Sequence, residues 1–174
     1  MNIAYTMAPG RGDTDLLLFR LAQRLSAQGL ATCGTVQINT ENPGTGPCDM
    51  DVRVLPDGPD ICISQNLGPG ASGCRLDPGA LERAVAAVAA ALTDRPDCLI
   101  INKFGRHEAE GNGFRDVIAE ALARGIPVLV GLNSMNAAAF QTFTAGLAVE
   151  VKPDLDTLSN WIRDSVAGRD DAVA

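Results

Sequence analysis

The chain has 174 residues, 46% of them hydrophobic, and a formal net charge of −7 at pH 7. A chain of this size is expected to form one globular domain that buries about two thirds of the surface exposed on unfolding. The acidic balance, without a basic stripe, argues against nucleic acid as a partner. No apolar run reaches the roughly 18 residues of a membrane span, and no leader opens the chain, so we expect a cytoplasmic protein.

Five cysteines, with no CxxC pair among them, argue against a disulfide framework and against a zinc ribbon. Cys62 and Cys98 lie in apolar runs and are expected to be buried. Cys48 and Cys74 lie in loop-like sequence, and Arg75 follows Cys74. A nearby cation favours the reactive thiolate, so a ligand or redox role for these two cysteines stays open.

The first predicted strand, Asn2–Met7, is short and apolar and is followed by Gly10 and Gly12. Apolar residues then recur at helical spacing across Thr14–Gln28, with a glycine next at the place of a helix C-cap. A glycine turn between a strand and a helix is the context in which backbone N–H groups bind phosphate.

The residues of this turn depart from the phosphate-binding pattern GxxxxGK[ST]. Gly12–Thr14 occupies the GK[ST] position, with Met7 in place of the first glycine and Asp13 in place of the lysine. A carboxylate there repels phosphate, although Arg11 could act as a substitute cation. The alternative is that Asp13 and Asp15 only cap the helix and complement its dipole.

The middle of the chain is predicted to add strands and one glycine-rich loop. Strands are expected at Ala31–Ile38, Met50–Leu55 and Asp60–Ser64. The glycine-rich segment Gln65–Arg75 is either a plain connector or a backbone cradle for a ligand. Asp77 then caps a helix that begins at Pro78 and continues to Leu92.

The C-terminal half is predicted to alternate strands and helices. The expected elements are strand Cys98–Ile101, helix Phe114–Arg124, strand Val128–Val130, helix Ala137–Thr144, strand Leu147–Val151 and helix Asp154–Val166. We expect residues 1–167 to form a single α/β domain and residues 168–174 a flexible tail.

The polar loop Asn102–Gly113 follows a buried strand, where the ligands of open parallel sheets bind. Its Lys103, with Arg106 and His107 close behind, could hold an oxyanion against the glycine turn. Equally, Lys103 could simply pair with Asp13 or Asp15.

Two other kinds of site have less support in this loop. His107, Glu108 and Glu110 are a sparse set of metal ligands, because the chain has no second histidine. A nucleophilic triad lacks its serine elbow, GxSxG.

The order of elements resembles an uncharacterised bacterial domain family that is related to P-loop nucleoside triphosphatases and linked to molybdenum uptake. The resemblance extends from Asn2 to about Ala145 and is strongest at Gly73–Asp77 and from Asn102 to Gly125. In the triphosphatase relatives, the strand corresponding to Cys98–Ile101 ends in an acidic Asp-Glu-Ile-Gly that holds magnesium-bound water. Here Asn-Lys-Phe-Gly stands in that place. The resemblance implies a three-layer, P-loop-like α/β fold with a mostly parallel sheet, altered motifs and a ligand-binding face.

These observations predict a protein that binds a small anion or a nucleotide, with nucleotide, phosphate or molybdate as the possible ligand. The candidate ligand-binding residues are Gly10, Arg11, Gly12, Asp13, Thr14, Gln37, Ser64, Gln65, Cys74, Arg75, Asn102, Lys103, His107 and Glu110. The alternatives are a nucleoside-triphosphate hydrolase with non-standard catalytic residues and a non-catalytic interaction protein of a molybdenum-related pathway. A homo-oligomer is compatible with the sequence.

Overall fold

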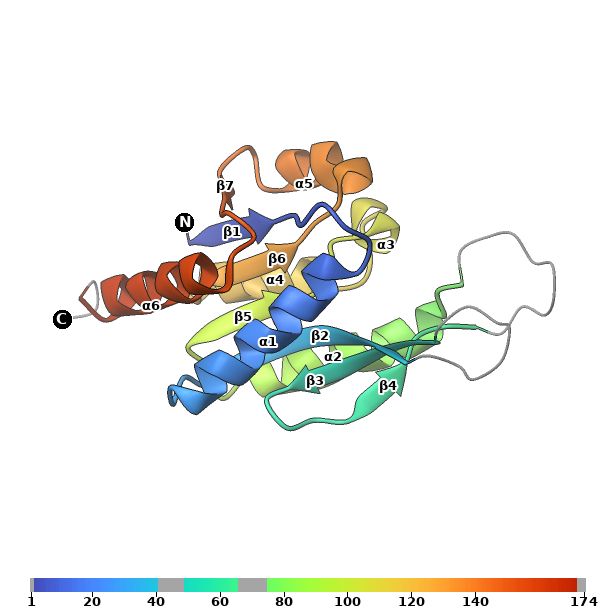
Figure 1. Cartoon of the computed structure of the whole chain (residues 1–174), viewed down its shortest axis with the longest axis horizontal. Coiled ribbons are helices and arrows are strands. Elements are labelled where there is room, and N and C mark those ends of the chain that lie inside the picture. Colours follow the sequence, from blue (N-terminus) through green and yellow to red (C-terminus); the bar gives the residue numbers. More distant parts are fainter. Residues whose placement is uncertain (1, 41–48, 66–74, 172–174) are drawn as a thin grey trace.

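The computed structural model describes residues 2–40, 49–65 and 75–171 (Figure 1). Its described strands form one sheet in the order β4-β3-β2-β5-β6-β1-β7. The strands are β1 (Ile3–Thr6), β2 (Thr32–Thr40), β3 (Asp49–Leu55), β4 (Asp60–Cys62), β5 (Cys98–Ile101), β6 (Val128–Gly131) and β7 (Val149–Glu150). Strands β2, β5, β6, β1 and β7 are parallel, and β3 pairs antiparallel with both β2 and β4. The predicted mostly parallel sheet is confirmed.

Helices cover both faces of this sheet and give the predicted three layers. They are α1 (Asp13–Ala27), α2 (Pro78–Leu92), α3 (Arg106–Ala109), α4 (Arg115–Ala123), α5 (Ala137–Phe143) and α6 (Leu155–Asp171), with a 3₁₀ turn η1 (Ser134–Asn136). Buried residues of α1 and α6 share one hydrophobic cluster, and those of α2, α4 and α5 share another. Within the described residues, no helix combines the length and the apolar content needed to cross a bilayer.

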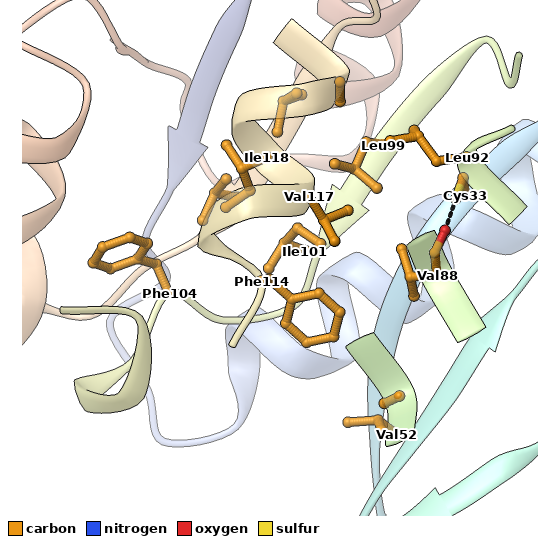
Figure 2. Packing of buried hydrophobic residues seen from close by; sticks show 14 of the residues in the cluster. Cys33, Val52, Val88, Leu92, Leu99, Ile101, Phe104, Phe114, Val117 and Ile118 are labelled. Atoms are coloured by element: carbon orange, nitrogen blue, oxygen red, sulfur yellow. Dashed lines mark hydrogen bonds between the residues drawn. The ribbon is translucent and has the colours of Figure 1, made fainter. Parts of the chain in front are cut away.

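The central strand β5 shows how the two cores divide the sheet. Leu99 and Ile101 belong to the cluster on the α2 and α4 face, where Figure 2 shows them near Val117. Cys98 and Ile100 belong to the cluster on the α1 and α6 face. All four residues of the strand are buried, as expected for a parallel strand covered on both faces.

Helix α2 begins at its predicted capping residue, whereas α1 has Gly12 as its N-cap and is not capped by the side chain of Asp13 or Asp15. Asp77 accepts a hydrogen bond from the backbone N–H of Ala80 at 3.0 Å and so caps α2. Helix α6 continues to Asp171, past Gly168, where the sequence predicted a tail. Arg169 anchors this extra turn by donating to the carbonyl of Pro96 at 3.1 Å.

Two predictions are corrected by the structure. Cys62 is exposed, because in the short strand β4 its neighbour Ile61 packs against the core and Cys62 points the other way. The loop predicted at Asn102–Gly113 contains the one-turn helix α3. Cys98 is buried as predicted, whereas Cys48 and Cys74 lie outside the described residues.

Candidate functional site

The candidate site lies at the edge of the sheet where β1, β2, β5 and β6 have their carboxyl ends, and it is centred on the turn from β1 to α1. Gly12 ends this turn with a φ of 82°, a conformation that favours glycine. The hydroxyl of Thr14 accepts a hydrogen bond from the backbone N–H of Ala8 at 3.0 Å. Thr14 therefore fastens the start of the turn to the first helical turn of α1.

Asp13 lies over this turn. A Cβ atom at position 10 would lie 2.1 Å from a carboxylate oxygen of Asp13, so the carboxylate is folded back against Gly10. Both Asp13 and the neighbouring Arg11 are exposed. A negative and a positive side chain thus flank the place where a phosphate-binding loop would present only backbone donors and a lysine.

Asp15 and Asn102 form a buried network that joins three elements. The Asn102 amide donates to Asp15 Oδ1 at 2.9 Å, and the Asn102 oxygen accepts from the backbone N–H of Gln37 at 3.0 Å. Asp15, Gln37 and Asn102 are all at most 8% exposed. Asn102 therefore ties the end of β5 to β2 and to α1.

The last residue of β6 allows this network to form. A Cβ atom at Gly131 would lie 2.0 Å from the carbonyl oxygen of Asn102. The Gly131 carbonyl also accepts a hydrogen bond from the N–H of Phe104 at 2.9 Å. Glycine at this position therefore lets β6 approach the backbone on either side of Lys103.

Lys103 pairs with Asp15, one of the two partners considered for it. Its ammonium lies 3.9 Å from Asp15 Oδ1, and its side chain is 43% exposed. This separation is within ion-pair range but beyond hydrogen-bond length. The Lys103 ammonium thus lies beside the first turn of α1, next to the glycine turn.

A cavity of about 240 Å³ adjoins this network. It is lined by Gly12, Asp15, Leu16, Phe19, Gln37 and Ile38. At the end of β1, six residues before Gly12, the buried hydroxyl of Thr6 has no hydrogen-bond partner among the described residues. The sequence does not single out Phe19, which lines this cavity, because it looks like an ordinary residue of an amphipathic helix.

Other candidate residues lie apart from this network. Gln65 and Arg75 pair with each other, the Gln65 N–H donating to the Arg75 carbonyl at 2.6 Å and Arg75 Nε to the Gln65 carbonyl at 3.2 Å. The Ser64 hydroxyl accepts from the N–H of Met50 at 3.0 Å. These contacts fasten the ends of the glycine-rich segment. Cys74 lies outside the described residues.

The charged residues in and just after α3 form hydrogen bonds with separate partners. His107 Nε2 lies 3.3 Å from a carboxylate oxygen of Glu82, and Glu110 accepts from Arg106 at 2.7 Å. Glu108 is buried and accepts from the N–H groups of Gly105 at 2.9 Å and Phe114 at 3.3 Å. In the part of the chain that the structure describes, no three His, Cys, Asp or Glu residues are grouped to hold a metal ion.

The magnesium expected in triphosphatases of this fold does not fit these residues. Asn102 stands where the acidic metal residue would be, and both ends of its amide are already bonded within the protein. Its oxygen is directed at the backbone N–H of Gln37.

Comparison with known proteins gives a family, a relative and a fold. The model of the family described as "Protein of unknown function (DUF2478)" matches residues 3–161. The molybdenum import ATP-binding protein ModC 2 of Bradyrhizobium diazoefficiens is 37% identical over 164 residues, which are 94% of this chain and 18% of that protein. The chain thus spans less than a fifth of this relative. The solution structure of a human cancer-related nucleoside triphosphatase covers 97% of both chains with a TM-score of 0.63 and 18% identity, which shows a shared fold.

Proposed function

Since the chain belongs to the family described as protein of unknown function (DUF2478), we propose its function from the site itself: it binds the phosphate groups of a nucleotide, or a similar small oxyanion. The ligand lies between the turn from β1 to α1 and Lys103. This is the place where open parallel sheets bind their ligands.

The observation that carries this proposal is the position of Lys103. Its ammonium is partly exposed and 3.9 Å from Asp15, so it retains hydrogen-bond donors for a ligand. An ammonium bonded to an oxyanion makes the strong, charge-assisted kind of hydrogen bond. The Gly12 end of α1 adds the partial positive charge of a helix N-terminus.

The two carboxylates at the turn set the strength of binding. Asp15 is buried and already bonded to Asn102, but Asp13 is exposed beside Gly10. Phosphate must therefore displace Asp13 or share Arg11 with it. We expect modest affinity for bare anions, because Asp13 stands where a phosphate-binding loop has lysine.

The relatives support a nucleotide or an oxyanion as the ligand class. The structural neighbour is titled a nucleoside triphosphatase, and the curated relative is named an ATP-binding protein of molybdenum import. ATP and molybdate are accordingly the probes to use.

The test is thermal stabilisation of the full chain by ATP, ATP with magnesium, and molybdate. We expect ATP to raise the melting temperature equally with and without magnesium. Lys103→Ala should abolish the shift. Lys152→Ala, which removes the chain's other lysine, located just after β7, should keep it. The proposal fails if none of the three ligands stabilises the chain, or if Lys103→Ala responds like the natural chain.

The alternative, hydrolysis of nucleoside triphosphates, is supported by the fold of the human neighbour. It requires catalysis without the lysine and the acidic residue that hydrolases of this kind use. Phosphate released from ATP by the natural chain, and lost in Lys103→Ala, would establish hydrolysis in place of binding alone.

A further inference from the structure

A second cavity, of about 370 Å³, lies alongside α1 further from its N-terminus. Its walls are formed on one side by α1, with Phe19, Ala22 and Gln23, and on the other by β2 and β3, with Val36, Arg53 and Leu55. Phe19 also lines the cavity beside Gly12, so both cavities adjoin this side chain. Figure 1 shows β3 and β4, the last two strands on one side of the sheet, extending beyond α1.

Two flat groups lie together in the wall of the second cavity. The guanidinium carbon of Arg53 lies 5.9 Å from the centre of the Phe19 ring. Asp60, on the neighbouring strand, fixes this guanidinium through two bonds, Arg53 Nε to Oδ1 at 2.7 Å and Nη2 to Oδ2 at 2.8 Å. A planar cation held in this way stacks on aromatic faces, and an aromatic side chain accepts the face of any nucleobase.

The rest of the groove provides an apolar floor and a polar rim. Val36 and Leu55 are buried beneath it. Gln23, Ser26 and Asp57 are exposed along it and offer donors and acceptors. A mainly apolar hollow with a few polar groups is the usual form of a small-molecule site.

The groove and the anion site lie within reach of one extended ligand. Phe19 is seven residues after Gly12 in α1, which is about 10 Å along a helix. We propose that the ligand is a nucleotide whose base lies against Phe19 and Arg53 while its phosphates lie at the turn. This inference rests on the proposed function, since it assigns the other end of the same ligand.

The test compares ATP with inorganic tripolyphosphate, which has the phosphates but no base, by calorimetric titration of the full chain. We expect ATP to bind at least about fivefold more tightly, the lower end of what one base–aromatic stack provides. Phe19→Leu should remove this preference and leave the affinity for tripolyphosphate unchanged.

A matched control is available on the opposite face of the sheet. Phe143 is also partly buried, and the guanidinium carbon of Arg115 lies 4.6 Å from the centre of its ring. Phe143→Leu therefore removes an equivalent ring and should keep the preference for ATP. Arg53→Lys, which keeps the charge but loses the planar group, tests the groove should Phe19→Leu fail to fold, and it should weaken ATP and not tripolyphosphate.

The outcomes separate the two proposals. Equal affinity for ATP and tripolyphosphate, or a preference for ATP that survives Arg53→Lys and a folded Phe19→Leu, overturns the base site and leaves the anion site standing. Binding of neither compound overturns both.

Discussion

Asp13 occupies the lysine position of a phosphate-binding loop, and its carboxylate is folded against Gly10. We predict that Asp13→Asn tightens ATP binding up to about fivefold, because it removes an exposed negative charge next to the phosphates. The gain should shrink as salt is added, since salt screens exposed charges. Asp94→Asn is the control, because Asp94 precedes β5 and so lies at the amino ends of the parallel strands. It should leave the affinity unchanged; a gain of equal size there would show that only net charge matters.

The cysteines should differ in reactivity according to their burial. Burial raises the pKa of Cys33 to about 11 and that of Cys98 to about 12, so both remain protonated thiols at pH 8. Cys62 is exposed. We predict that iodoacetamide at pH 8 labels Cys62 in the folded chain and leaves Cys33 and Cys98 unlabelled until denaturant is added, as peptide mass mapping can show. Early labelling of Cys98 would contradict the buried position of β5.

The buried carboxylate of Glu108 holds the segment that follows Lys103 in place. Glu108 accepts hydrogen bonds from backbone N–H groups on both sides of α3, at Gly105 and Phe114. We predict that Glu108→Ala lowers the free energy of unfolding by about 2 kcal/mol, because it leaves these donors without their acceptor. Urea denaturation measures the change. Glu110→Ala, which removes only an exposed pair with Arg106, should change stability by less than about 0.5 kcal/mol.

The elements that could be predicted were those with a full local pattern. Helix α2 has both a capping residue, Asp77, and proline at its first position, and its sequence predicts its start correctly. Helix α3 was missed, because one turn is too short to show a helical period. The inward direction of Glu108 was missed for the same reason. Cys62 was predicted wrongly, because its apolar neighbours were taken as a sign of burial, although the alternation along the strand places Ile61 and Ile63 on the core side and Cys62 on the other.

At the scale of the whole molecule, the sheet order explains which parts of the site were predictable. The family and the three-layer fold expected from the sequence are confirmed. The proximity of the turn after β1 and the loop after β5 could be predicted, since parallel strands end at one edge, whereas their role in binding stays a prediction. The groove could not be predicted, because Phe19 and Arg53 belong to elements that meet only when α1 crosses from β1 to β2 beside β3.

The burial of each strand should also determine how readily its backbone opens to solvent. Strands β1, β5 and β6 are buried along their whole length, whereas β7 is exposed and β4 is exposed at both its ends. We predict that native-state hydrogen exchange is slowest in the fully buried strands β1, β5 and β6 and fastest in β4 and β7. Exchange in β4 as slow as in β5 would show that the edge opens only with the whole sheet.

The hydrogen bond between Asn102 and Asp15 restricts which residues can occupy these two positions, which are 87 residues apart in the chain. The bond needs an amide donor at position 102, and an aspartate there would place two carboxylates together in a buried space, where one of them could not keep its charge. Acidic residues at both positions are therefore disfavoured, since one of them would have to take up a proton. We expect the two positions to covary among members of the family: chains with an acid at 102 should have a neutral or basic residue at 15, as an alignment of the family can test.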